Sequence, residues 1–481
     1  MPSKNTFFTT CEDCLGLGKK KRRIKKSVRL RYQSDLAIFE KSNGQGSAPV
    51  RLEAHLYTCP TCGGSGLAAC EHQPLPDTEN LPHIAIIGGG IGGVALAVAC
   101  LHRSIPFTIY ERDNSFNERS QGYGLTLQQA SKAMDGFGIF ELEKGVVSTR
   151  HLVHTPEGKV IAEWGMRKWL ENSEKSAPKK SNIHIARQSL RSALIHQLGG
   201  ADQIKWGHQL IDFNENKAGK MDLTFLNNGK STTASADLIV GADGIRSAVR
   251  NILISEDISP LRYLDCIVIL GICPLDSLAA TESHLLDSAT VFQTANGNER
   301  IYVMPFDADS VMWQLSFPMP EQEAKNLSSK GSAALKEEAI RRTNWHSPVP
   351  EIIRATLANQ ISGYPVYDRA LLTPELMGDF GNVTLIGDAA HPMSPFKGQG
   401  ANQALLDALA LARDISRKCS PMSDWKEEAL RKRVLADFES EMIQRSSIKV
   451  EDSAAAAQFL HSEIALYEGN EPRGRVLKRK D

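Results

Sequence analysis

The longest apolar segment of the chain is an uncharged stretch from Ile84 to Leu101, which glycines interrupt near its start. A helix needs about 18 apolar residues at least to span a bilayer. Five of the six residues from Gly88 to Gly93 are glycine, and each would cost a helix interior about 1 kcal/mol relative to alanine. The pattern therefore predicts a strand, a tight turn and a buried helix, and we expect no membrane span.

From His83 onward, strand-like runs, glycine turns and helical segments alternate along the chain. This alternation is typical of an α/β domain. Further strands are predicted at Arg300–Phe306 and Val311–Phe317, and the polar segment Arg167–Asn182 is predicted to be an exposed insertion. Some alternating side chains of these strands could line a pocket, although such side chains more often belong to a core: they are Tyr302, Met304, Trp313 and Phe317.

Residues 1–66 follow a different pattern, in which two cysteine pairs flank alternating segments. Cys11–Gly18 and Cys59–Gly66 both fit the pattern C-x-x-C-x-G-x-G. Between them, residues 28–32 and 50–56 alternate apolar and polar side chains with the period of a strand. We expect a small β module over residues 1–66, with a cysteine knuckle at each outer end, and a proline-containing linker over residues 67–82.

Composition narrows the classes of protein to which the chain can belong. Its 481 residues suggest two or three domains, and 41% hydrophobic and 23% charged residues are typical of a globular protein. The 56 basic and 56 acidic side chains balance, so the overall charge does not attract nucleic acid or anionic lipid. Nine cysteines without a recognisable secretory signal favour a cytoplasmic protein over a secreted disulfide scaffold.

The glycine cluster matches a fingerprint for binding a dinucleotide. Gly88, Gly90 and Gly93 form the string G-x-G-x-x-G between a predicted strand and a predicted helix. The next strand-like run ends at Glu111, about 20 residues further on, where a carboxylate accepts hydrogen bonds from ribose hydroxyls. The glycines let the backbone approach a pyrophosphate, whose charge the helix N-terminus attracts. Because a carboxylate would repel a 2′-phosphate, Glu111 favours FAD or NAD over NADP.

Two further segments resemble motifs of a known enzyme family. Residues 236–250, which include Asp243, resemble the DG motif of single-component, class A FAD-dependent aromatic hydroxylases. Residues 383–402, which include Asp388 and Gly400, resemble the GD motif of the same family. The three motifs follow one another in the family's order, and the resemblance covers residues 83 to about 460.

This resemblance implies an α/β fold in which a Rossmann-like FAD-binding domain carries a β-sheet substrate domain. The expected FAD-binding segments are about 83–150, 183–255 and 375–420; the substrate sheet is expected mainly at 256–374, and a C-terminal tail at 461–481. Within the family, the chain looks most like the tetracycline-inactivating monooxygenases and related fungal-type hydroxylases, on the basis of Tyr110–Asn114, Arg119 and Pro395–Asn402.

The resemblance also implies roles for individual residues. Those expected to bind the FAD, together with the fingerprint, are Gly88, Gly90, Gly93, Glu111, Arg112, Arg187, Asp243, Asp388 and Gly400. Arg119 is a candidate for binding NADPH or NADH, although such an arginine is more often a solvated surface charge. Pro395 and Phe396 are the substrate-proximal candidates, and His391 is interpreted as positional. No catalytic side chain is expected, because the flavin carries the chemistry.

The cysteine pairs resemble the cysteine-rich repeats of J-domain chaperones, although the chain has two repeats and no J domain. Thiolates from Cys11, Cys14, Cys59 and Cys62 are the complement for one tetrahedral structural Zn²⁺, which would supply folding energy to so small a module. Unliganded cysteines or disulfides are the alternative. The basic run Lys19–Lys26 could contact nucleic acid or act as a nuclear signal, but a solvated hairpin edge is favoured.

The resemblance thus predicts a monooxygenase that uses FAD, NAD(P)H and O₂. It would hydroxylate an electron-rich small molecule, phenolic, enolic or polyketide-like, through a flavin C4a-hydroperoxide. The alternative is a zinc-module interaction protein whose flavin domain binds nucleotide but does not hydroxylate. A flavin reductase or oxidase without hydroxylation is a third possibility.

Overall fold

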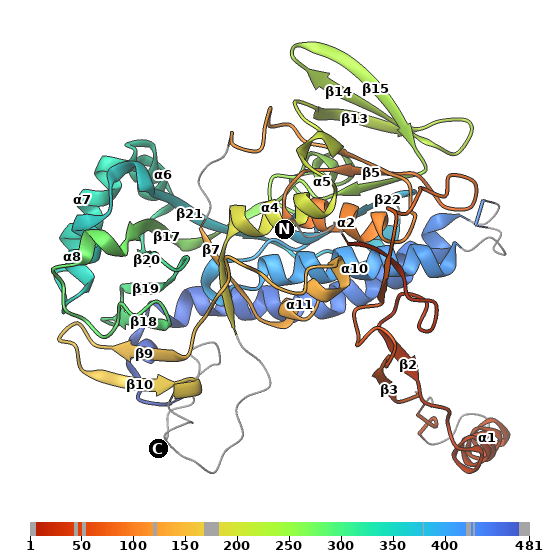
Figure 1. Cartoon of the computed structure of the whole chain (residues 1–481), viewed down its shortest axis with the longest axis horizontal. Coiled ribbons are helices and arrows are strands. Elements are labelled where there is room, and N and C mark those ends of the chain that lie inside the picture. The colour runs from red at the N-terminus through yellow and green to blue at the C-terminus, as the bar shows by residue number, and fades with distance from the viewer. Residues whose placement is uncertain are drawn as a thin grey trace. The chain divides into compact units, whose positions relative to one another are not determined.

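The computed structural model describes residues 6–42, 47–50, 54–118, 123–167, 182–378, 380–419, 425–426 and 429–470 (Figure 1). The chain divides into two compact units, Met1–Leu75 and Pro76–Asp481. Arg119 and nearly all of the predicted insertion Arg167–Asn182 lie outside the described residues. In the part of the chain that is described, no helix is both long and apolar enough to cross a membrane.

Two short antiparallel ladders form the first unit. Strand β1 (Phe7–Thr10) pairs with β4 (Leu67–Cys70), and β2 (Lys19–Lys21) pairs with β3 (Leu56–Thr58). Phe7 stands opposite Cys70, so the prediction that a linker begins at residue 67 is wrong. Strand β4 pairs with β1, which lies at the other end of the unit, so no local sequence pattern predicts β4.

Helix α1 (Lys26–Lys41) occupies the segment in which residues 28–32 were expected to form a strand. That prediction is wrong because five alternating residues are also compatible with a helix. Val28, Tyr32 and Leu36 follow one another at the i, i+4 spacing of a helix face. No residue of α1 is buried. Of the second expected strand, residues 51–53 lie outside the described residues, and β3 begins only at its last position, Leu56.

A five-stranded parallel sheet forms the centre of the second unit. Its strands, in spatial order, are β12 (Ile204–Lys205), β6 (Phe107–Tyr110), β5 (Ile84–Ile87), β16 (Leu238–Gly241) and β22 (Val383–Leu385). All residues of β5 and β16 are buried, as their continuous apolar runs require in a sheet covered on both faces. Helix α2 (Ile91–Leu101) follows the glycine turn and packs on α10 (Gly400–Lys418), which confirms the predicted strand, turn and helix.

A seven-stranded sheet forms the second layer of this unit. Its strands, in spatial order, are β10 (Val160–Trp164), β9 (Arg150–His154), β18 (Thr290–Ala295), β19 (Arg300–Pro305), β20 (Ser310–Pro318), β17 (Leu261–Pro274) and β21 (Ile361–Arg369). Figure 1 shows three helices against this sheet, α6 (Glu321–Ser329), α7 (Ser332–Arg342) and α8 (Val349–Ala355). Strands β9 and β10 come from earlier in the chain than residues 256–374, where the sheet was mainly expected.

Smaller elements connect the two sheets and complete the unit. Two further three-stranded sheets have the orders β7 (Gly124–Leu127), β11 (Ile183–Ala186), β8 (Val146–Val147) and β13 (Gln209–Glu215), β14 (Met221–Asn227), β15 (Lys230–Ala236). The remaining α-helices of the described chain are α4 (Arg187–Gln197), α5 (Ala248–Leu253), α9 (Pro374–Gly378) and α11 (Ala436–Phe459).

Candidate functional site

The turn between β5 and α2 depends on glycine at two of its positions. Gly88 has a φ of +111°, and a Cβ there would lie 2.5 Å from the carbonyl oxygen of Ala242. A Cβ at Gly93 would lie 1.9 Å from the carbonyl oxygen of Gly88. At Gly90, by contrast, a Cβ would meet nothing within 4 Å. Gly88 and Gly93 therefore allow close packing of the protein on itself, whereas Gly90 borders open space.

Glu111, at the end of β6, binds the backbone of the same turn. Its Oε2 accepts a 2.7 Å hydrogen bond from the N–H of Gly89, and its Oε1 accepts one of 3.1 Å from Asp113. Each carboxylate oxygen keeps a further lone pair for a ribose hydroxyl. Arg112, the next residue, is about half exposed beside Asp113. Arg191 was not singled out in the sequence, yet its Nε donates to the carbonyl of Gly89 at 2.7 Å.

Asp243 follows β16, and its carboxylate binds the start of α5. It accepts hydrogen bonds from the N–H of Ala248 at 2.7 Å and of Val249 at 3.3 Å, and from the hydroxyl of Ser247. Burial raises the pKa of Asp243, while these hydrogen bonds oppose that shift. In this structure the side chain is thus engaged in capping a helix. Its neighbours Ala242 and Gly244, rather than Asp243 itself, line the cavity described below.

Asp388 and Arg187 form another part of the site, where their opposite charges influence each other. Asp388 follows β22 and lies close to the start of α10, where a Cβ on Gly400 would be 3.3 Å from its Oδ1. Its carboxyl is open to the cavity, but the surrounding protein raises its pKa by desolvation, which the positive charge of Arg187 partly opposes. Arg187 begins α4, and its guanidinium lies 5.5 Å from the ring centroid of Tyr123.

A cavity of about 1060 Å³ connects these residues with the seven-stranded sheet. The predicted site residues in its wall are Gly90, Arg187, Asp388, Pro395, Phe396 and Gly400. The other predicted site residues that the structure describes do not line it; they are Gly88, Gly93, Glu111, Arg112 and Asp243. Ligand cavities commonly measure about 300–1,000 Å³, so this cavity is large for a single small molecule.

The residues present fit an FAD. The N-terminus of α2, at Gly90, Ile91 and Gly92, opens into the cavity, and its N-cap has no side chain that binds the first amides. Such free amides and the helix dipole suit a pyrophosphate. Gly398 has a φ of +58°, and no side chain caps α10 either. The N-terminus of α10 therefore also borders the cavity. Its dipole would stabilise negative charge on the flavin ring when the flavin is reduced.

The aromatic and methionine side chains that alternate along β19 and β20 lie on two different faces of the sheet. Tyr302 and Met304 line the cavity, together with their cross-strand partners Gln314 and Met312. Trp313 and Phe317 are fully buried on the opposite face of the sheet. Trp313, Phe317 and Met304 are therefore buried as the general expectation of core requires, and Tyr302 and Met304 also border the cavity. The alternation alone could not decide which face borders the cavity.

Asn402 is a buried polar residue with four side-chain hydrogen bonds, and the sequence pattern assigned it no role. It is 1% exposed. Its Oδ1 accepts from the N–H groups of Gln128 and Ala130, and its Nδ2 donates to the carbonyls of Thr126 and Gly398, all within 3.2 Å. Asn402 therefore fixes the loop after β7 to the start of α10. Its place two residues after Gly400 in the GD motif was the only available signal.

His391 belongs to a buried polar cluster beneath the cavity wall. Its Nε2 lies 2.7 Å from Oδ2 of Asp407, which also accepts from the N–H of Gly387, while Arg445 donates to Oδ1 at 2.9 Å. Burial alone would raise the pKa of Asp407, but His391 and Arg445 lower it. His391 is absent from the cavity wall. This position agrees with its interpretation as positional.

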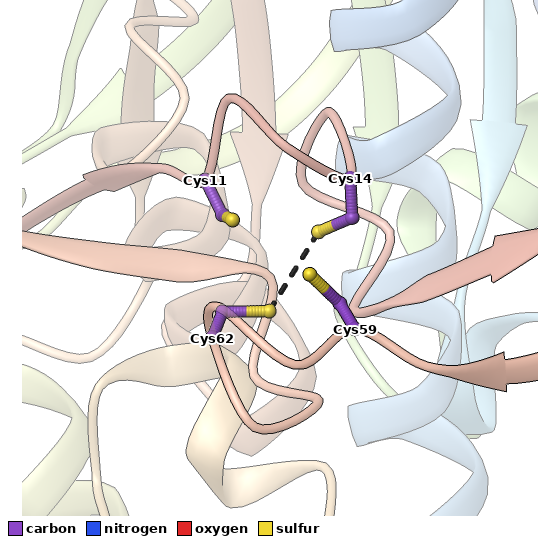
Figure 2. Close-up of side chains that lie close together, drawn as sticks. All are labelled: Cys11, Cys14, Cys59 and Cys62. Carbon is purple, nitrogen blue, oxygen red and sulfur yellow. Dashed lines mark hydrogen bonds between the residues drawn. The ribbon is translucent and has the colours of Figure 1, made fainter.

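Four of the five cysteines of the first unit lie around one point, as Figure 2 shows. The Sγ atoms of Cys11, Cys14, Cys59 and Cys62 all lie within 4.8 Å of one another. Zn–S bonds of about 2.3 Å in a tetrahedron place the sulfurs about 3.8 Å apart, and the Cys14–Cys62 distance is 3.7 Å. The cluster therefore has the size of a tetrahedral Zn²⁺ site.

The glycines after each cysteine pair have two functions in this cluster. The N–H of Gly18 donates to Sγ of Cys14, and that of Gly66 to Sγ of Cys62, both at 3.2 Å. Gly18 and Gly66 also have positive φ angles, and a Cβ on either would lie within 2.3 Å of a carbonyl oxygen of the other knuckle. The repeated pattern thus supplies both sulfur hydrogen bonds and close packing between the knuckles.

The fold and the cavity define a dinucleotide-binding α/β protein with an attached sheet domain. A family model described as "FAD binding domain" matches residues 82–420. The chain belongs to this FAD-binding family.

Known proteins with similar sequence or structure agree with this assignment. The aurachin C monooxygenase/isomerase of Stigmatella aurantiaca is 30% identical over 338 residues, covering 69% of this chain and 80% of that protein. HpxO of Klebsiella pneumoniae, solved with FAD and uric acid, has a TM-score of 0.63 at 20% identity over 79% of this chain and 88% of its own. The tetracycline destructase Tet(51) has a TM-score of 0.56 at 18% identity, covering 79% and 92%. These two structures share the fold. The family match and the monooxygenases among the sequence relatives show that this chain is an FAD-dependent monooxygenase.

Proposed function

We propose that the chain uses NAD(P)H and O₂ to hydroxylate an electron-rich aromatic or polyketide-like small molecule held in the cavity of the second unit. The observation that carries this proposal is the composition of that cavity. One wall offers two uncapped helix N-termini and Asp388, and the other offers Tyr302, Met304 and Met312 on the seven-stranded sheet. The first wall suits a flavin dinucleotide, and the second suits a largely apolar ring system.

The residues of the site would bind and orient rather than react. Gly90 and the start of α2 would hold the pyrophosphate of the FAD, Glu111 the ribose, and Asp388 with Arg187 a hydroxyl-bearing part nearer the ring. When bound, the FAD supplies hydride acceptance from NAD(P)H and activation of O₂. Pro395 and Phe396 would hold the substrate against the ring and exclude water. Arg119 stays our candidate for contacting NAD(P)H.

The test of this proposal measures oxygen transfer, not only flavin binding. The full-length protein should purify yellow, and suitable substrates should accelerate its oxidation of NADH or NADPH. One oxygen atom from ¹⁸O₂ should appear in the product. Flavin-bound protein that oxidises NAD(P)H without incorporating ¹⁸O would be a reductase or oxidase. Colourless protein would favour the interaction protein. The likeness to Tet(51) adds tetracyclines to the compounds to test, and the relative from Stigmatella aurantiaca adds aurachin C, alongside phenols.

For the first unit we propose that Cys11, Cys14, Cys59 and Cys62 bind one structural Zn²⁺. The size of the cluster and the amide donors at two of its sulfurs support this proposal. The cysteines are almost the whole core of the unit, so the metal would replace hydrophobic burial as the source of folding energy. The likeness to J-domain chaperones remains a likeness of the cysteine–glycine pattern.

A further inference from the structure

Arg300 is a buried cation in the wall of the cavity, and it has no acidic partner among the described residues. It lies on β19 and is 6% exposed. Its Nε donates a 2.6 Å hydrogen bond to Oε1 of Gln293, and its guanidinium lies 5.0 Å from the ring centroid of Tyr302. These contacts orient the guanidinium, but neither neutralises its charge.

The remaining donors of Arg300 face the cavity. Nη1 and Nη2 make no hydrogen bond to the described protein, yet they are not among the enclosed polar atoms that lack a partner. They must therefore border open space, and the open space beside Arg300 is the cavity. Burying a charge without a counterion is costly. Desolvation accordingly lowers the pKa of Arg300 to about 10, a value at which it is still protonated near neutral pH.

Strand register and ring contacts place Arg300 on the substrate side of the cavity. Arg300 stands opposite Ser316 on β20, whose hydroxyl lies 2.8 Å from Nε2 of His461. The ring of His461 lies 5.4 Å from that of Phe396, one of the two substrate-proximal candidates. The pyrophosphate-binding turn at Gly90 belongs to the other sheet. An anion bound by Arg300 would therefore be part of the substrate rather than of the FAD.

We propose that the substrate carries an oxyanion, either a carboxylate or an ionised enol, which binds Nη1 and Nη2 of Arg300. This inference rests on the proposed function and names its substrate class. A guanidinium offers two parallel donors that match a carboxylate, and it suits a single enolate oxygen less rigidly. The apolar remainder of the substrate would contact Met304 and Met312, which line the same wall.

The experiment compares anionic probes with neutral matches on the flavin-loaded protein at pH 8. One pair is 1-hydroxy-2-naphthoate and its methyl ester; the other is the enolate of dimedone and its methyl enol ether. Binding is followed by the change in flavin absorbance. The native protein should bind at least one anion more tightly than its neutral match. Arg300→Gln should raise the Kd of that anion about tenfold to a hundredfold and leave the neutral match nearly unchanged.

Three controls make the result specific. Arg300→Lys keeps the cation but not the paired donors, so the anion's Kd should rise by a smaller factor. If Arg300→Gln does not fold, this variant still tests the proposal. Arg341→Gln removes an exposed arginine paired with Glu338 and should behave like the native protein. The FAD content of each variant is measured alongside.

The inference is overturned if the native protein prefers neither anion, or if Arg300→Gln weakens anion and neutral match equally. Loss of FAD from Arg300→Gln would also overturn it, because Arg300 would then bind the cofactor. The proposed function fails in a different way. A protein that binds anions through Arg300 but incorporates no ¹⁸O would leave this inference standing and contradict the hydroxylation.

Discussion

Asp388 carries the most specific assignment that can be tested at the scale of one residue. Its carboxyl points into the cavity between Arg187 and the start of α10. A hydrogen bond from a flavin hydroxyl to this carboxylate would contribute about 1.5–3 kcal/mol. Asp388→Ala should therefore raise the Kd of the apoprotein for FAD about tenfold to a hundredfold, measured by quenching of flavin fluorescence.

Asp437→Ala is the matched control for this change. Asp437 is exposed and pairs with Lys418 on the outside of the unit, so its removal should leave the Kd for FAD as it is. If Asp388→Ala protein retained one FAD per chain with an unchanged Kd, Asp388 would have no part in binding the cofactor.

At the scale of the element, the β5–α2 turn separates glycines that the fold needs from a glycine that the ligand needs. A Cβ at Gly93 would collide with the carbonyl oxygen of Gly88, whereas a side chain at Gly90 would enter open space. Gly93→Ala should thus lower the free energy of unfolding of the apoprotein by about 1–3 kcal/mol, as overpacking does. Gly90→Val should leave that free energy nearly unchanged and abolish FAD binding.

Urea unfolding of both apoproteins and FAD titration measure the two effects. The contrast is the informative result, since each variant is the other's control. Equal destabilisation by both substitutions would mean that Gly90 also supports packing. An apoprotein with Gly90→Val that still bound FAD tightly would exclude the turn as the pyrophosphate site.

For the whole molecule, features that depend on residues close together in the sequence could be predicted, whereas features that depend on contacts between distant residues could not. The glycine turn and Glu111 could be located because a strand, a turn and a helix follow one another directly. Strand β4 was missed because its partner β1 lies at the far end of the unit. Arg300 could not be predicted as a site residue because its position in the cavity wall depends on the register of β19 against its neighbouring strands. Whether a buried charged side chain has an ionic partner depends on tertiary packing, and a local sequence pattern does not show it.

The division into two units also predicts how the molecule unfolds. Unit Met1–Leu75 has a core of little more than four cysteines, whereas Pro76–Asp481 has large apolar cores around both sheets. A ligand stabilises only the unit whose native state it binds. Heating should therefore produce two transitions. Removal of Zn²⁺ by a chelator should abolish the first, and added FAD should raise the midpoint of the second alone.

Calorimetry of the full chain, with bound zinc measured by atomic emission, tests this expectation. Cys59→Ser should lose the metal and the first transition together. Cys70→Ser should keep both, because Cys70 is not part of the four-sulfur cluster. A single transition that both ligands shift would mean that the units unfold as one. Two transitions with no bound zinc would instead require another source of stability for the first unit, and the buried residues of its described part offer none of comparable size.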